Sequence, residues 1–171
     1  RLGIETSLAD PTDAAAIRAA MRPNTRMILV EVISNPTIRV ADMEGIARIS
    51  SETGVLLVVD NTFSPLILSP KQLGADIVIH SMTKFISGAS DFIAGAVCAD
   101  AAFIQQLMDL HTGMLMVLGP TMDPQVAFNI SLRIPHLPLR MTEHGRRTLI
   151  FAERLQALGL TVNYPGLTTH P

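Results

Sequence analysis

The stretch Val55-Leu56-Leu57-Val58-Val59-Asp60 decides how the rest of the sequence is interpreted. Five apolar residues in a row predict a strand. Similar apolar runs occur at Ile77-Val78-Ile79 and from Met27 to Ile33, and the lack of alternation from Met27 to Ile33 is typical of a parallel sheet that is covered on both faces. Because helical patterns separate these runs, we expect an α/β fold with a mostly parallel sheet flanked by helices.

The expected helices have recognisable start and stop residues. Asp10-Pro11 would open a helix that runs to about Met21, with proline at its first position. Asp42 would cap a second helix, and Gly54 would end it. Further helices are expected at about 101–110, 124–133 and 139–158, and further strands at 94–99 and 161–164.

Composition excludes several classes of protein. Apolar residues make up 48% of the 171 residues and charged residues 16%, which favours a folded domain over disorder. The formal net charge of -2 gives no electrostatic basis for binding nucleic acid, and no apolar run is long enough to predict a membrane span. Cys98 is the only cysteine, which excludes an internal disulfide and favours a reducing, cytoplasmic location.

Polar side chains follow three of the expected strands at the points where the strands end. Asp60 ends the strand at 55–59, and Ser81-Met82-Thr83-Lys84 comes just after the strand at 77–79. Asn35 follows the first strand. Ligands in open parallel sheets bind at the carboxyl ends of the strands. We therefore expect these side chains to lie around one site.

These side chains are the groups needed to hold pyridoxal phosphate. The Lys84 amine can form a Schiff base, and the Asp60 carboxylate can pair with the pyridine nitrogen and keep it protonated. The hydroxyls of Ser81 and Thr83 can bind phosphate oxygens, and the Asn35 amide can reach the phenolic oxygen. The sequence thus predicts pyridoxal phosphate as the cofactor.

Each of these motifs also has a plainer interpretation. A lysine in a loop is most often a surface charge, and Asp-Asn and Asn-Pro pairs are common in turns. The spacing of Ser81 and Lys84 also occurs in penicillin-binding proteins and class A β-lactamases, but no Ser-Asp-Asn or Lys-Thr-Gly motif supports that alternative. An aspartate that ends an apolar strand is costly to bury unless a cation faces it, which favours the cofactor.

Arginines at 133 and 140 flank the segment Ile134 to Pro138. They could bind an anion, but pairing at the surface or between domains is the more ordinary role for such residues. We therefore expect them to pair at the surface or between domains.

Three segments carry a resemblance to a known family. Glu31-Val-Ile-Ser-Asn-Pro-Thr37, Val59-Asp-Asn-Thr-Phe63 and His80-Ser-Met-Thr-Lys-Phe-Ile-Ser-Gly88 resemble the Cys/Met-metabolism family of pyridoxal-phosphate enzymes. The likeness continues through Asp91-Phe-Ile-Ala-Gly-Ala-Val97 and Tyr164-Pro-Gly-Leu167, so it covers essentially the whole chain. It implies a type I, aspartate aminotransferase-like large domain and a homotetramer built from catalytic dimers.

The resemblance also implies a role for each site residue. Lys84 would hold the cofactor and move protons, and Asp60 would pair with the ring nitrogen. Ser81 and Thr83 would hold the phosphate, and Asn35 the ring hydroxyl. Other family site residues would lie outside 1–171, so we expect the chain to be a piece of a longer protein and inactive alone.

The same resemblance implies two units in the chain. Residues 1–136 would be the central part of the cofactor-binding large domain. Residues 137–171 would be a long linking helix and the start of a second domain.

Within the family, Lys84-Phe-Ile-Ser-Gly88, Met114 to Met122 and Arg133-Ile-Pro-His136 most resemble plant-type methionine γ-lyases. This implies a carbon–sulfur lyase that converts methionine, or another small sulfur amino acid, into a thiol, 2-oxobutanoate and ammonia. The family more often has Arg-Gly-x-Lys-Thr at 133, and the turn after Phe63 is one residue short, so the substrate stays open. The alternatives are a cystathionine γ-synthase, an O-acylhomoserine sulfhydrylase, a cystathionine lyase or a non-catalytic scaffold.

Overall fold

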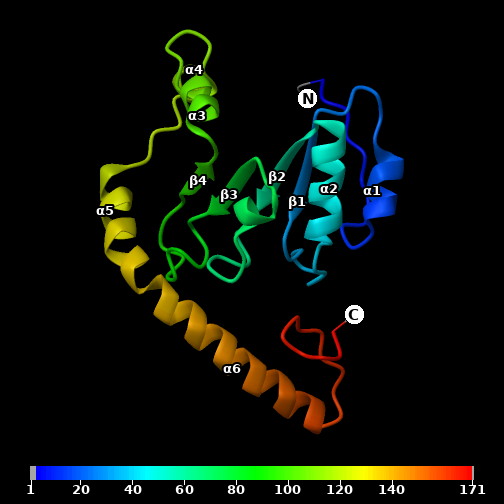
Figure 1. Cartoon of the computed structure of the whole chain (residues 1–171). Helices are drawn as coiled ribbons and strands as arrows, with labels where there is room; N and C mark the ends of the chain where they lie inside the picture. The colour runs from blue at the N-terminus through cyan, green and yellow to red at the C-terminus, as the bar shows by residue number, and fades with distance from the viewer. Residues whose placement is uncertain (1–2, 171) are drawn as a thin grey trace.

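A four-stranded sheet with the order β1-β2-β3-β4 lies at the centre of the fold (Figure 1). Its strands are β1 (Met27–Glu31), β2 (Leu56–Asp60), β3 (Ile77–Ser81) and β4 (Gly95–Cys98). The first three strands run parallel, and β4 pairs antiparallel with β3. The computed structural model describes residues 3–170. The predicted α/β class and the mostly parallel sheet are confirmed.

The register of the parallel strands places their carboxyl ends at one edge of the sheet. Glu31 at the end of β1 is the partner of Asp60 at the end of β2. Asp60 is in turn the partner of Ile79, two residues before the end of β3. The turns that follow β2 and β3 therefore leave the sheet from neighbouring points.

The hydrophobic core lies between the sheet and two helices, α1 (Ala14–Ala20) and α2 (Met43–Thr53). Ile46 of α2 packs there with Leu57 and Val59 of β2, and all three are 0% exposed. On β1, however, burial alternates, and Leu29 is 65% exposed. The expectation that both faces of this strand are covered is wrong for residues 3–170, because α1 and α2 share one core on the same face.

The boundaries of α2 are as predicted, whereas α1 begins later than expected. The Asp42 side chain accepts from the Gly45 amide, and Gly54 ends α2 with φ +69°. In α1 the cap is Asp13, whose carboxylate accepts from the amides of residues 15 and 16. The Asp10 carboxylate is instead engaged by Thr12 in the preceding turn, so Pro11 stands before the helix.

The second half of the chain is mainly helical. Its helices are α3 (Ala101–Leu107), α4 (Met114–Leu118), α5 (Pro124–Arg133), η2 (Ile134–His136) and α6 (Leu137–Ala157); the short η1 (Pro70–Leu73) precedes β3. Figure 1 shows α6 running past the sheet, after which the chain turns back towards β1 and α2. Asn163 donates to the Thr37 carbonyl in this returning segment. Residues 161–164 form no strand, so the strand predicted there is wrong.

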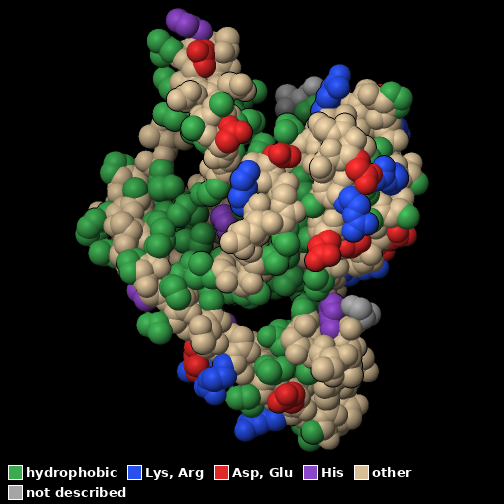
Figure 2. Space-filling view, in the orientation of Figure 1, with side chains coloured by type: hydrophobic (Ala, Val, Ile, Leu, Met, Phe, Trp, Pro, Cys, Tyr) green, Lys and Arg blue, Asp and Glu red, His purple; other side chains and the backbone are tan. Residues whose placement is uncertain are grey.

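Charged and hydrophobic side chains are unevenly distributed over the surface. Figure 2 shows hydrophobic side chains gathered around α5, whereas most charged side chains lie over α1 and α2 and along α6. Phe128 and Leu132 of α5 are each 57% exposed. None of the helices found in residues 3–170 is long and apolar enough to cross a bilayer.

The core predicts a stability effect at Ile46. Ile46→Ala would open a cavity between α2 and the sheet and lower the free energy of unfolding by about 2 to 5 kcal/mol. Arg48→Ala on the exposed side of α2 should change it by no more than about 0.5 kcal/mol. Urea unfolding of the intact protein measures both values. Equal effects of the two substitutions would contradict this assignment of the core.

Candidate active site

A cavity of about 550 Å³ opens at the edge where β1 and β2 end. It is lined by Glu31, Ile33, Asn35, Asp60, Thr62, Phe63, Lys84, Phe85, Gly88, Ser90 and His144. Three of the five residues singled out in the sequence, Asn35, Asp60 and Lys84, therefore line one space. They come from three different strand ends, 25 and 24 residues apart in the sequence.

Hydrogen bonds fix the position of the Asp60 side chain. Its Oδ1 accepts from the Thr62 amide at 2.9 Å. The Thr62 hydroxyl in turn accepts from the Ser81 amide at 2.7 Å, so the turn after β2 is tied to the end of β3. The next residue, Asn61, is buried and accepts from the Ser64 hydroxyl at 2.6 Å. These contacts hold the carboxylate-bearing turn close to the segment that carries Lys84.

The two predicted phosphate-binding hydroxyls are not among the residues that line this cavity. The Thr83 hydroxyl accepts from the Ala94 amide at 3.0 Å and lies 3.3 Å from the Ala94 carbonyl, to which it donates. The Ser81 side chain is half-buried at the end of β3. Ser81 is the last residue of β3 and Thr83 follows it, beside the segment that leads into β4.

Lys84 sits in a compact turn. The Ser87 amide donates to the Met82 carbonyl at 2.8 Å, and the Gly88 amide donates to the Lys84 carbonyl at 2.9 Å. Gly88 has φ +74°, a conformation that side chains other than hydrogen disfavour. The turn therefore fixes the backbone of Lys84, while its side chain is exposed at the cavity.

Two carboxylates and one amine face the cavity. Glu31 and Asp60 are register partners and both contribute to its wall. Glu31 Oε2 also accepts from the Asn35 amide at 3.0 Å, which ties the residue after β1 to the same edge. Two neighbouring carboxylates attract positive charge, so the space suits a ligand with a cationic group in addition to the Lys84 amine.

His80 stands just behind the cavity in β3. Burial lowers the pKa of His80, while the charge of Asp60 and a backbone hydrogen bond at Asn61 oppose that shift. Its Nδ1 is buried and has no hydrogen-bond partner among the described residues. A lowered pKa favours the uncharged ring at neutral pH, which leaves Asp60 without a permanent cation on this side.

Several lining residues were not predicted from the sequence. The Phe85 ring lies edge-on to both Phe63 and His144, with centroids 5.9 Å apart in each pair. Glu31 could have been found, because it ends a strand as Asp60 does. His144 comes from α6, 60 residues after Lys84, and no local pattern in the sequence marks it.

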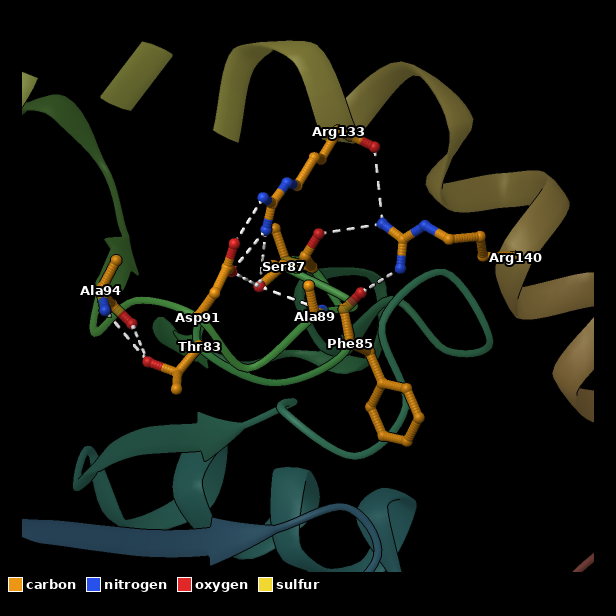
Figure 3. A network of polar contacts seen from close by, with 9 residues as sticks. Thr83, Phe85, Ser87, Ala89, Asp91, Ala94, Arg133 and Arg140 are labelled. Atoms are coloured by element: carbon orange, nitrogen blue, oxygen red, sulfur yellow. Dashed lines mark hydrogen bonds and ion pairs between the residues drawn. The ribbon is translucent and has the colours of Figure 1, made fainter. Parts of the chain in front are cut away.

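The two arginines considered in the sequence bind the segment that follows Lys84. Arg133 forms two hydrogen bonds with the Asp91 carboxylate, at 2.6 and 2.7 Å. Arg140 donates to the backbone carbonyl of Phe85 (Figure 3) and also to that of Ile86. Both arginines are thus engaged within the chain, on the outer side of the turn.

Several known proteins are similar to this chain along nearly its whole length. The methionine γ-lyase of Arabidopsis thaliana is 52% identical over 98% of the chain and 38% of its own length. The L-methionine γ-lyase of Pseudomonas putida is 36% identical over 99% of the chain and 43% of its own length. The chloroplastic cystathionine γ-synthase 1 of Arabidopsis thaliana is 35% identical over 100% of the chain and 30% of its own length.

The chain thus spans less than half the length of these relatives. Residues 1–171 match, from end to end, the model of the family described as Cys/Met metabolism PLP-dependent enzyme, where PLP is pyridoxal phosphate. The chain therefore belongs to the Cys/Met-metabolism family of pyridoxal-phosphate-dependent enzymes.

Proposed function

We propose that the protein containing this chain is a carbon–sulfur lyase that releases methanethiol, 2-oxobutanoate and ammonia from methionine and water. The observation that carries the proposal is the cavity that both Asp60 and Lys84 line, one from the end of β2 and the other from the turn after β3. The 52% identity to a plant methionine γ-lyase supports methionine as the substrate.

The residues around the cavity fit pyridoxal phosphate. A carboxylate held by a backbone amide can accept a hydrogen bond from a protonated ring nitrogen, and Asp60 offers this arrangement. An amine on a flexible stem can bond covalently to the aldehyde, and Lys84 offers that. A second carboxylate, Glu31, adds to the negative potential around the ring.

Each residue of the site then has a role. Lys84 holds the cofactor, and its Nζ takes and returns the protons at the α- and β-carbons of the substrate. Asp60 would hold a proton on the ring nitrogen, and Asn35 would orient the ring hydroxyl. Ser81 and Thr83 lie beside the cavity and not in its wall, so the Thr83 hydroxyl would have to exchange its donor contact with the Ala94 carbonyl for one with phosphate. The cofactor, when bound, supplies an electron sink for negative charge at the substrate α-carbon.

We place this site in the central part of a type I, aspartate aminotransferase-like large domain, formed by residues 1–136. The remaining residues, 137–171, are the linking helix and the start of a second domain; α6 begins at Leu137, at that boundary. We further propose that the intact protein is a cytoplasmic homotetramer and takes a small sulfur-containing amino acid. Light scattering of the purified intact protein measures its molar mass and therefore tests the tetramer.

A transferase is the second candidate, because the cystathionine γ-synthase relative also matches the whole chain. Methionine alone distinguishes the two activities. We expect the intact protein to release methanethiol and 2-oxobutanoate in equal amounts from methionine, with no second substrate. Turnover only with an activated homoserine and a thiol would instead identify a transferase. Cofactor binding without turnover of any such substrate would identify a non-catalytic homologue.

Within this chain, lysine occurs only at positions 71 and 84, which makes the attachment site testable. Borohydride reduction of the cofactor-loaded intact protein should fix the cofactor mass on the peptide with Lys84. Lys84→Ala should abolish this label and the visible absorbance of bound cofactor. Lys71→Ala, at an exposed position of η1, should keep both. Label on Lys71, or label retained after Lys84→Ala, would overturn the assignment.

Asp60→Asn tests the charge on the ring nitrogen without removing the local hydrogen bond, because the Asn oxygen can still accept from the Thr62 amide. We expect kcat to fall roughly 100-fold or more, since a preorganised charge is lost at the reacting group. Asp76→Asn is the matched control, because the Asp76 carboxylate accepts from the Leu57 amide at the other end of β2. Steady-state kinetics that give equal kcat values for both variants would contradict the role of Asp60.

A further inference from the structure

The segment 85–91, directly after Lys84, is held from outside by two helices. Figure 3 shows Arg133, at the end of α5, and Arg140, the fourth residue of α6, both directed at this segment. The two residues, here called the arginine pair, do not line the cavity. Their contacts are with the backbone and side chains that follow the lysine.

Arg140 binds the backbone carbonyls of the two residues that follow Lys84. Its Nη1 lies 2.5 Å from the Phe85 carbonyl and its Nη2 lies 2.9 Å from the Ile86 carbonyl, so one guanidinium spans consecutive peptide groups. Its Nε donates to His136 Nδ1 at 3.0 Å, which fixes the third donor. A planar guanidinium with all these donors engaged has little freedom to move.

Arg133 fixes the far end of the same segment. It forms a two-point ion pair with Asp91 at 2.6 and 2.7 Å, and its Nη1 also lies 3.1 Å from the Ser87 hydroxyl. The hydrogen bonds from Arg133 lower the pKa of Asp91 to about 2, so Asp91 stays charged at any working pH. The Arg133 guanidinium also lies 5.2 Å from the Phe92 ring centroid.

Gly88 shows how closely the arginine pair approaches the turn. A Cβ at this position would lie 2.5 Å from Arg140 Nη1, and the guanidinium carbon would be 3.0 Å away. Hydrogen at position 88 is therefore what allows Arg140 to reach the Phe85 and Ile86 carbonyls. The turn and the guanidinium fit each other with no space between them.

We propose that Arg133 and Arg140 are positioning residues, which set the direction in which the Lys84 amine enters the cavity. The inference rests on the proposed role of Lys84. The internal hydrogen bonds of the turn fix its shape, whereas the arginine pair fixes its position relative to α5 and α6. A displacement of about 1 Å at a reacting group can cost roughly 100-fold in rate, so this restraint bears directly on catalysis.

The test uses the intact, cofactor-loaded protein with Arg140→Met, which keeps an apolar stem and removes every donor. Arg140→Lys, which keeps one cationic donor, is the conservative partner. Arg146→Met is the matched control, because Arg146 lies in the same helix and, among residues 3–170, its side chain pairs with the half-buried Glu143 and not with the turn after Lys84. Each variant is measured below its own melting temperature and at saturating cofactor.

We expect Arg140→Met to lower kcat roughly 10- to 100-fold while KM changes less than about threefold. The pH at which the visible absorption band of the lysine-bound cofactor changes should differ between Arg140→Met and the wild-type protein. Arg140→Lys should recover part of kcat and part of the spectral shift. Arg146→Met should match the wild-type protein in kcat, in KM and in the pH at which the band changes.

Hydrogen exchange gives a readout without cofactor. In the cofactor-free protein, the Ser87 and Gly88 amides should exchange faster in Arg140→Met than in Arg146→Met. For Arg133, the single variant Arg133→Asp should lower kcat. The double variant Arg133→Asp with Asp91→Arg, which swaps the two charges, should restore it. If Arg140→Met does not fold, Arg140→Lys and the double variant with swapped charges test whether the arginine pair positions Lys84.

Wild-type kcat, spectrum and exchange rates in the folded arginine variants would overturn the proposal. A loss of melting temperature alone, with kcat per folded molecule unchanged, would also overturn it. Failure of the proposed function looks different, because the wild-type protein itself would then fail to release methanethiol from methionine alone or would lack the visible band of a lysine-bound cofactor.

Discussion

Parallel pairing of β1 with β2 and of β2 with β3 places Glu31 beside Asp60 and Asp60 beside Ile79, and the site depends on this register. A parallel ladder fixes which residue stands opposite which, so a shift by one position would turn Asp60 to the other face of the sheet. The apolar core under the strands makes such a shift costly, because Leu57 and Val59 would leave it. The core therefore determines where the carboxylate points.

The turns at the edge of the sheet carry the chemistry and are restrained by contacts that the sheet does not supply. The Thr62 hydroxyl connects the turn after β2 to Ser81. The turn that carries Lys84 is closed by its own amides and held on its outer side by Arg133 and Arg140. Site residues on loops are positioned by the rigid elements around them, and here those elements are both the sheet and two helices.

The sequence predicted the sheet and the three cavity residues Asn35, Asp60 and Lys84, because apolar runs and strand-end rules are local patterns. The boundaries of α2 were also local, since Asp42 and Gly54 act within one turn. The start of α1 was missed because Asp10 and Asp13 both fit a cap, and only their hydrogen bonds distinguish them.

Contacts between distant segments were beyond the reach of the sequence. His144 and Arg140 reach the site because α6 passes the turn, and nothing in their own neighbourhoods encodes that path. The segment at 161–164 has strand-like residues but bonds to the loop after β1 through Asn163. Its conformation is thus set by tertiary contacts, which override local preference.

The most direct test of the account is a crystal structure of the intact protein with pyridoxal phosphate bound. We expect continuous electron density from Lys84 Nζ to the cofactor and an Asp60 oxygen about 2.6 to 3.2 Å from the ring nitrogen. A cofactor bonded to another lysine, or an Asp60 side chain that faces away from the ring, would contradict it.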